Sequence, residues 1–332
     1  MRDVIRLSLN YPWLAGGWFI VFTSLAVGDE TPKQDYVFAY FIGNGEDGLH
    51  LAHSTDGLNW TALKGGESFL RPEAGDDKLM RDPSIVRGPD GTFHMVWTVS
   101  WHEKSIGYSS SRDLIHWTPQ QTLPVMKHEA KAANCWAPEI FYDDATETYI
   151  IVWSTTIPGR FTETEGQPSQ SIPEAGSNHR LYCVTTRDFK IYTDTRLFYD
   201  QKFNVIDGAI AKIAAGSYVL FLKDETNVPL APQKNIRIAF AEAAAGPYGP
   251  ASAPITGDFW AEGPSPLKIG DQWYVYFDCY REDRYGAVTS RDLKHWTDIS
   301  DQLKMPPDAT HGTAFAVPQG IASILSDVKP AQ

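Results

Sequence analysis

Four short segments, each carrying a carboxylate, recur along the chain and lead into apolar segments with strand character. These openers occupy residues 81–85 (RDPSI), 136–140 (WAPEI), 206–210 (IDGAI) and 261–265 (AEGPS), and the apolar segments occupy residues 92–97, 149–153, 218–222 and 273–277. The spacings between the carboxylates of Asp82, Glu139, Asp207 and Glu262 are 57, 68 and 55 residues. Such spacings are close to the length of a four-stranded blade, so the repeat predicts a β-propeller.

A second pattern repeats out of phase with the openers. Residues 54–60, 111–117 and 290–296 share the pattern Ser-x-Asp-x-x-x-Trp, and residues 186–192 form a looser copy with Thr and Tyr at its ends. The pattern is typical of a turn at the end of a blade, in which the Asp side chain bonds to the backbone and the aromatic ring covers the outer strand. We therefore interpret these Asp and Trp residues as structural.

The two ends of the chain supply a fifth blade. Residues 35–60 are rich in strand character but lack an opener, whereas residues 311–317 have strand character and begin 49 residues after Glu262. Joining the two segments would close the propeller and remove the exposed edges of an open sheet. We expect an all-β, five-bladed β-propeller that forms one domain over residues 29–332, with its core at about 35–318.

Charge and aromatic content indicate the kind of ligand. The net charge is −12 and no basic cluster occurs, so the sequence gives no support for a nucleic-acid partner or for an anionic membrane surface. An uncharged ligand is favoured. The eleven Trp residues fit a protein that stacks on sugar rings, although aromatic side chains also fill the interfaces between blades.

The N-terminal 28 residues have the features of a secretory signal peptide. Basic residues are followed by an apolar run over residues 13–27, with small residues at Ala26 and Gly28. The run is short for a membrane-spanning helix, so we expect cleavage near Gly28 and a secreted or periplasmic protein. Three cysteines, Cys135, Cys183 and Cys279, lack the spacing of a disulfide framework or a zinc site, and we expect them to be buried.

The openers also contain the groups that could act chemically. Inner strands of a propeller surround a central channel, so carboxylates at their starts converge at one end of the axis. Hydrolysis of a glycosidic bond needs a general acid for the departing oxygen and a second carboxylate that acts as base or nucleophile. Asp82, Glu139, Asp207 and Glu262 are the candidates.

Over residues 35–318 the chain resembles glycoside hydrolase family 43, whose members are five-bladed propellers that act mostly on polysaccharides containing arabinose and xylose. The resemblance is carried by Asp-Pro-Ser-Ile at 82–85, Trp-Ala-Pro at 136–138 and Glu-Gly-Pro at 262–264, in the family's order. It implies that Asp82 is the general base, Glu262 the general acid and Glu139 the residue that tunes the acid. The family has Asp where this chain has Glu139, and Asp207 is the alternative for the tuning role.

The resemblance extends to His311 and Gly312, which are similar to a late His-Gly element of the family. In family members this imidazole faces the channel and often meets a metal, usually calcium, through water. The resemblance therefore implies a structural or electrostatic calcium ion near His311, while the two-carboxylate reaction requires no cofactor. The other residues expected to contact substrate are Trp101, Trp136, Lys223, Arg284 and His311, together with Asp207. The loop at residues 157–180 is a candidate wall of the pocket.

These features together predict a secreted, exo-acting, inverting glycoside hydrolase that acts on an oligo- or polysaccharide. Release of terminal α-L-arabinofuranose from plant-type polysaccharides is the favoured activity. A β-xylosidase or a galactose-releasing glycosidase is the alternative within enzymes. A propeller that binds carbohydrate without cleaving it is the alternative outside them, because a fold does not fix a function.

Overall fold

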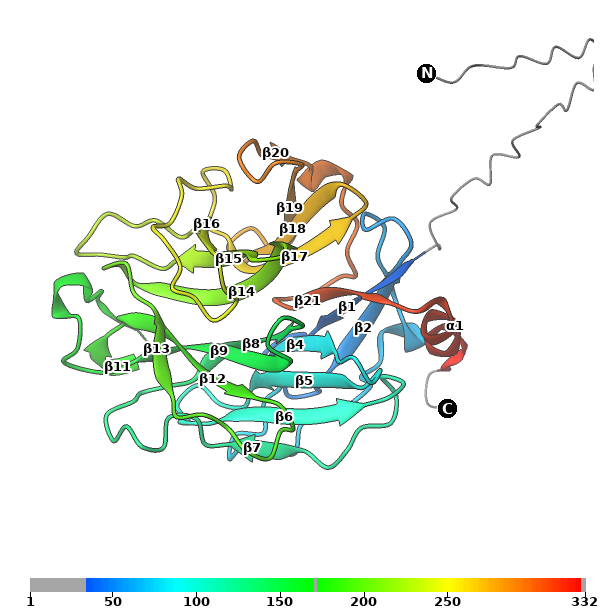
Figure 1. The fold of residues 1–332 in the computed structure, drawn as a ribbon, viewed down its shortest axis with the longest axis horizontal. Helices are drawn as coiled ribbons and strands as arrows, with labels where there is room; N and C mark the ends of the chain where they lie inside the picture. The colour runs from blue at the N-terminus through cyan, green and yellow to red at the C-terminus, as the bar shows by residue number, and fades with distance from the viewer. Residues whose placement is uncertain (1–33, 170–171, 330–332) are drawn as a thin grey trace, which may run out of the picture. The chain divides into compact units, whose positions relative to one another are not determined.

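The computed structural model describes residues 34–169 and 172–329, and its strands form five antiparallel blades (Figure 1). The predicted all-β, five-bladed propeller is therefore confirmed. The expected signal peptide at residues 1–28 lies outside the described residues. Within the described ranges, no helix has the length and apolar character needed to cross a membrane.

Each blade is one antiparallel sheet whose strands follow the chain outward from the axis. The first such sheet contains β4 (Arg81–Arg87), β5 (Phe93–Thr98), β6 (Ile106–Ser111) and β7 (Gln121–Leu123). The second contains β8 (Trp136–Asp143), β9 (Thr148–Thr156), β12 (His179–Thr186) and β13 (Arg196–Tyr199). The third has β14 (Val205–Ala214), β15 (Ser217–Asp224) and β16 (Asn235–Ala241), and the fourth has β17 (Glu262–Ile269), β18 (Gln272–Cys279), β19 (Arg284–Ser290) and β20 (Thr297–Asp298).

The fifth blade joins the two ends of the described chain. Its strand order is β21-β1-β2-β3, with β21 (Thr313–Val317), β1 (Asp35–Tyr40), β2 (His50–Ser54) and β3 (Thr61–Ala62). The pairing runs from Asp35 opposite Val317 to Ala39 opposite Thr313. The predicted closure by both termini is confirmed, and β21 serves as the innermost strand of this blade.

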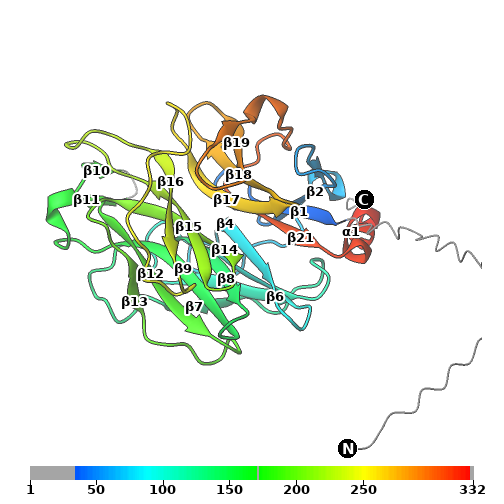
Figure 2. The same cartoon turned by 45° about the horizontal axis from the view of Figure 1, so that its top comes forward.

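The inner strands form a closed ring of neighbours. β4 contacts β8, β8 contacts β14, β14 contacts β17, β17 contacts β21, and β21 contacts β4. In Figure 2 the strands β4, β8, β14 and β17 lie together at the centre. Because each opener begins one of these four strands, the chain places the openers around one end of a common axis.

Every opener contains a β-bulge at the same place. The register with the next strand shifts between Arg81 and Ser84, Trp136 and Glu139, Ile206 and Ala209, and Glu262 and Ser265. The first bulged residue has a left-handed backbone in each case: φ is 51° at Asp82, 43° at Ala137, 53° at Asp207 and 61° at Gly263. Left-handed non-glycine residues are uncommon and gather at functional sites.

The four carboxylates do not occupy equivalent positions relative to this bulge, although the sequence motifs aligned them. Asp82 and Asp207 occupy the left-handed position, Glu262 precedes it by one residue, and Glu139 follows it by two. Successive side chains of a strand point to opposite faces of the sheet, so the four carboxylates occupy three non-equivalent positions.

The repeated Ser-x-Asp turns form as predicted. Asp56 Oδ1 accepts hydrogen bonds of 2.8 Å from the backbone N–H groups of both Leu58 and Asn59, and Trp60 donates its indole N–H to the carbonyl of Gly57. Asp113, Asp188 and Asp292 accept the corresponding backbone bonds in their copies. The three cysteines are free and buried, as expected.

The remaining elements are short. Within the described ranges, three 3₁₀ helices occupy Lys64–Gly66, Thr162–Thr164 and Ser300–Gln302, and a small hairpin pairs β10 (Pro168–Ser169) with β11 (Ile172–Gly176). One helix, α1 (Gln319–Asp327), follows β21 and buries Ala322 and Leu325 in the same apolar cluster as Val37 and Val317. The sequence patterns did not indicate this helix, whose nine residues carry only two buried side chains.

Candidate active site

A pocket of about 170 Å³ opens where the inner strands begin. Seven of the nine expected site residues line it: Asp82, Glu262, Asp207, Trp101, Trp136, Lys223 and His311. Glu139 and Arg284 do not. None of the lining residues comes from the loop at residues 157–180, so the expectation that this loop walls the pocket is not met among the described residues.

Asp82 lies in the pocket beside a histidine and a hydroxyl. Thr98 donates a hydrogen bond of 2.8 Å from Oγ1 to Oδ2 of Asp82, and His311 Nδ1 lies 3.3 Å from Oδ1. Burial opposes ionisation of Asp82, but the charge and hydrogen bond of His311, with Arg81 and Thr98, together outweigh it and lower the pKa of the carboxyl. Burial likewise opposes protonation of His311, but Asp82 raises the imidazole pKa to about 10. At neutral pH the pair is therefore a carboxylate and an imidazolium.

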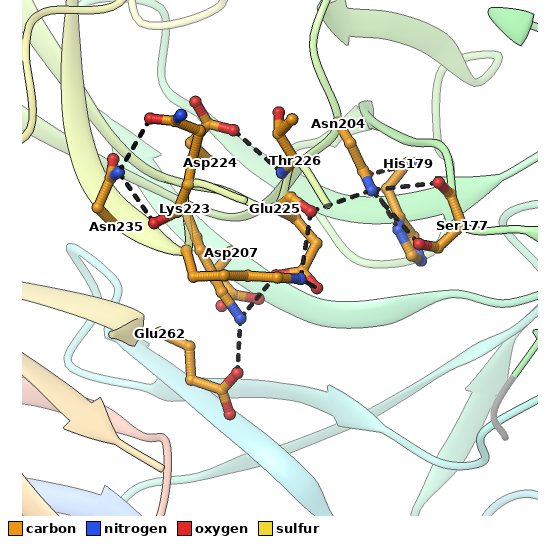
Figure 3. A network of polar contacts seen from close by, with 12 residues as sticks. Ser177, His179, Asn204, Asp207, Lys223, Asp224, Glu225, Thr226, Asn235 and Glu262 are labelled. Carbon is orange, nitrogen blue, oxygen red and sulfur yellow. Dashed lines mark hydrogen bonds and ion pairs between the residues drawn. The ribbon is translucent and has the colours of Figure 1, made fainter. Parts of the chain in front are cut away.

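Glu262 lies against a buried lysine. Lys223 Nζ is 2.8 Å from Glu262 Oε2, and the lysine side chain is only 2% exposed while that of Glu262 is 28% exposed. Figure 3 shows the lysine reaching from β15 to the carboxylate at the start of β17. The same ammonium lies 2.7 Å from Glu225 Oε2. Glu262 therefore has an open face toward the pocket and a positive charge behind it.

Asp207 is joined to the turn that carries Glu262. Its Oδ2 atom accepts a hydrogen bond of 3.0 Å from the backbone N–H of Gly263, and its own N–H donates to Ser154 Oγ. Burial raises the pKa of Asp207 to about 6, in spite of the nearby charges of His311 and Lys223. This carboxyl thus touches the segment of the candidate acid directly.

Glu139 does not line the pocket, although its charge interacts with those of His311, Asp207 and Asp82. Ser84 donates a hydrogen bond of 2.6 Å to Glu139 Oε2, and Ser84 Oγ accepts one from the N–H of Ile140. Burial raises the pKa of Glu139 to about 7. Because Glu139 follows the left-handed residue Ala137 by two positions, it joins β8 to β4 and makes no contact with the segment of Glu262 among its described hydrogen bonds.

Two tryptophans form a wall of the pocket. Trp101 and Trp136 meet edge to face, with ring centres 5.5 Å apart, and Trp136 donates its indole N–H to the carbonyl of Trp101. Trp101 in turn donates to Asn44 Oδ1, and the guanidinium of Arg81 lies 4.2 Å from the centre of the Trp101 ring. These contacts hold both rings in place, as a surface for stacking on a sugar requires.

Arg284 is misplaced in the sequence-based site. It lines a separate pocket of about 890 Å³ and pairs with Glu282 at 2.7 Å. Arg284 begins β19, the third strand of its blade, whereas the pocket of about 170 Å³ with Asp82 and Glu262 is built around the inner strands. Tyr280 lines both pockets.

Sequence reasoning missed six lining residues: Arg81, Thr98, Ala137, Ile206, Glu225 and Tyr280. Arg81 directly precedes Asp82, and Glu225 follows Lys223 by two residues, so their closeness in sequence to expected site residues could have indicated them. Tyr280 follows β18, and no sequence motif indicated it. Its ring centre lies 4.6 Å from Lys223 Nζ.

The expected calcium ion finds no set of direct ligands. Within residues 34–169 and 172–329, no group of three or more His, Cys, Asp or Glu side chains is arranged to hold a metal ion. The Nδ1 atom of His311 faces Asp82, and the imidazole is protonated at neutral pH. A protonated imidazole does not ligate a metal, so the described residues do not fit direct coordination at His311.

Sequence comparison identifies related proteins. Residues 31–320 match the family Glyco_hydro_43_rel, described as a probable glycosyl hydrolase domain. An α-L-arabinofuranosidase from Bifidobacterium longum subsp. longum is 24% identical over 216 residues, which are 58% of this chain. The match spans only 20% of the length of that relative.

Solved structures are similar to this chain at low sequence identity. The Hadza microbial sialidase Hz136 is 16% identical, with a TM-score of 0.53 over 76% of this chain and 54% of that one. An α-L-arabinofuranosidase from Lactobacillus brevis is 19% identical, with a TM-score of 0.49 over 67% of this chain and 72% of that one.

Proposed function

The chain belongs to the glycosyl hydrolase 43-related family, and from this premise we propose that it is an inverting, exo-acting glycosidase that releases terminal α-L-arabinofuranose. One observation carries the proposal. Asp82 and Glu262 line the same small pocket, and each has its own cationic partner, His311 for Asp82 and Lys223 for Glu262. Two carboxyl groups in one pocket are what glycosidic hydrolysis requires.

Asp82 acts as the general base. His311 holds it as a carboxylate, so it can take a proton from a water molecule while the water oxygen bonds to the anomeric carbon. Glu262 starts the reaction protonated and gives its proton to the glycosidic oxygen as the bond from that oxygen to the anomeric carbon breaks. Lys223 then stabilises the carboxylate that forms on Glu262. The configuration at the anomeric carbon inverts because water attacks from the side opposite the leaving group.

Asp207 takes the tuning role in this proposal. It bonds to the turn that carries Glu262, whereas Glu139 bonds to Ser84 on the neighbouring inner strand. A buried carboxyl near Glu262 favours the protonated form of the acid by charge repulsion. We assign Glu139 a supporting role between β8 and β4.

The size and lining of the pocket support exo action on a neutral sugar. At about 170 Å³ it is well below the roughly 300–1,000 Å³ of sites for drug-sized ligands, so it suits one sugar unit. Trp101 and Trp136 provide the stacking surface, and the carboxylates and Lys223 provide partners for hydroxyl groups. The reaction proposed uses no metal. A calcium ion at His311 would have to be held through water and would be structural.

A relative supports the choice of sugar. The B. longum protein is named as an α-L-arabinofuranosidase, which favours arabinofuranose over the alternatives. The substrate would be an arabinose-bearing plant-type oligo- or polysaccharide, met outside the cell or in the periplasm after cleavage near Gly28. N-terminal sequencing of exported protein tests the location: a chain that begins near Asp29 agrees with it, and an intact Met1 contradicts it.

A panel of nitrophenyl glycosides tests the activity. We expect purified protein to hydrolyse the α-L-arabinofuranoside faster than the β-D-xylopyranoside or the β-D-galactopyranoside. Preference for the xyloside or the galactoside would support a β-xylosidase or a galactose-releasing enzyme instead. Sugar binding by calorimetry without any hydrolysis would support the non-catalytic carbohydrate-binding propeller.

A further inference from the structure

A second buried lysine lies behind the first, with one carboxylate between them. Glu225 pairs with Lys223 at 2.7 Å through Oε2 and with Lys234 through Oε1 (Figure 3 shows Lys223, Glu225 and Glu262). The lysine side chains are 2% and 4% exposed, and that of Glu225 is 17% exposed. Lys234 also donates to the backbone carbonyl of Glu225. The mechanism above uses Lys223 but gives Glu225 and Lys234 no part.

The pairing of Glu225 with Lys223 affects the charge that the general acid Glu262 meets. A general acid must hold its proton before the reaction, yet the Lys223 ammonium group lies 2.8 Å from Glu262 Oε2. Glu225 offsets part of that positive charge, because its carboxylate is ion-paired with the same ammonium nitrogen. Lys234 acts in the opposite sense, since it offsets part of the charge of Glu225.

The charges of these groups are consistent with such a balance. Burial opposes ionisation of Glu225, but Lys223 and Lys234 lower the pKa of its carboxyl, so it remains a carboxylate. Burial opposes protonation of Lys223, but Glu225 and Glu262 raise its pKa well above the ordinary value. Burial lowers the pKa of Lys234.

Other groups also face Glu262. Asp207 approaches from β14, Asp278 lies opposite Glu262 in the pairing of β17 with β18, and Tyr280 follows β18. Asp82 and Arg81 on β4 and His311 before β21 also line the pocket, and His179 on β12 interacts with the charges of Glu225, Lys234 and Lys223. None of these groups pairs with Lys234 among the described ion pairs, and Lys234 acts on Glu262 both through Glu225 and through its own charge.

We propose that Glu225 is a positioning residue for the general acid: it holds Lys223 in place and offsets part of the ammonium charge that Glu262 meets. The inference rests on the proposed function for its catalytic meaning. The proposal predicts opposite effects for the two partners of the Glu225–Lys234 ion pair. Loss of the Glu225 carboxylate leaves more positive charge behind Glu262. Loss of the Lys234 ammonium group leaves less positive charge there.

The first test follows the pH dependence of kcat/KM on an unactivated arabino-oligosaccharide, whose leaving group needs the acid. We expect Glu225→Gln to move the alkaline limb to lower pH by about one unit, in line with the effect of a like charge within about 4–6 Å. Lys234→Gln should move it to higher pH by less. On a dinitrophenyl glycoside, whose leaving group departs without protonation, both shifts should disappear.

A matched variant controls for the loss of a buried ion pair. Glu129 has a side chain 16% exposed and pairs with Arg160, and it lies outside the pocket. Glu129→Gln makes the same chemical change at nearly the same burial and should leave the alkaline limb where it is. A shift in this variant equal to that in Glu225→Gln would overturn the proposal, because it would make the effect a general consequence of losing an ion pair.

A second measurement separates this inference from the proposed function. The side-chain carboxyl carbon of Glu262, labelled with ¹³C and assigned by its absence in Glu262→Gln, is titrated by NMR without any substrate. Its midpoint should fall in Glu225→Gln and rise in Lys234→Gln, even if no glycoside is hydrolysed. An unchanged midpoint in both variants, or a shift of the same sign in both, contradicts the inference. If Glu225→Gln does not fold, as judged by circular dichroism, the sign of the shift in Lys234→Gln decides.

Discussion

The Oδ2 atom of Asp207 accepts a hydrogen bond of 3.0 Å from the backbone N–H of Gly263. Gly263 directly follows Glu262, so one carboxylate on β14 fixes the turn that aims another carboxylate into the pocket from β17. Gly263 has a left-handed backbone, and a Cβ atom there would meet the His311 ring at 2.4 Å. The turn therefore requires glycine, and Asp207 and His311 hold it from two sides.

Replacing Asp207 tests this coupling. Asp207→Asn removes the charge that favours protonated Glu262 and weakens the bond to Gly263. We expect kcat on an arabino-oligosaccharide to fall by about 10²-fold, as is usual when acid catalysis is impaired, with KM changed much less. Asp144→Asn, at a surface carboxylate paired with Lys212, is the control and should behave as the wild type. Equal losses in the two variants would refute the assignment.

The two principal carboxylates should respond differently to the leaving group. Asp82→Asn should lower kcat/KM by at least about 10³-fold on every substrate, because no leaving group removes the need to activate water. Glu262→Gln should lose a similar factor on oligosaccharides but much less on a dinitrophenyl glycoside. Full activity of Asp82→Asn on any glycoside would show that another residue is the base.

The openers show what sequence could and could not predict. Their repetition, with the strands that follow, was enough to predict four blades and a shared site, and the terminal segments predicted the fifth blade; Asp82, Asp207 and Glu262 do meet in the site. Aligning the openers on their carboxylates was wrong, because the bulge aligns Asp82 and Asp207 with Ala137 and Gly263. A residue's position in a bulge depends on hydrogen bonding to the next strand, which short motifs do not encode.

The same limit explains the residues that were misplaced or missed. Glu139 was assigned by its motif, but its place in β8 directs it to Ser84. Arg284 was chosen for its charge near a strand start, and that strand is the third of its blade rather than the first. Glu225 and Lys234 are close in space because β15 and β16 pair, and only the structure shows that Glu225 shares Lys223 with Glu262.

Glu139 should make the stability of the fold depend on pH. Burial raises its pKa from 4.5 to about 7 in the folded protein, so the folded state binds the proton more tightly than the unfolded state does. Ionisation therefore destabilises the fold as pH rises from about 4.5 to above 7. We expect Glu139→Gln to be more stable than the wild type by about 1–3 kcal/mol at pH 8 and nearly equal at pH 4.5, as measured by urea unfolding. A pH-independent difference would contradict this account.

Strand β21 should be essential for folding, whereas α1 should not. A chain ending at residue 310 lacks the strand that pairs with β1 and closes the ring, and it exposes the edge of β1. We expect it to aggregate or unfold. A chain ending at residue 318 keeps β21 and loses only the packing of Ala322 and Leu325, so it should remain soluble with a lower Tm. A soluble and active chain ending at 310 would refute the closure argument.

The configuration of the first sugar released tests the central claim, that Asp82 activates water while Glu262 protonates the leaving group. Proton NMR during the first minutes of hydrolysis of an α-L-arabinofuranoside, before mutarotation, identifies the anomer formed. The account predicts that the β-anomer of arabinose appears first and the α-anomer later. First appearance of the α-anomer would show that configuration is retained, and hence that a carboxylate attacks the sugar rather than activating water.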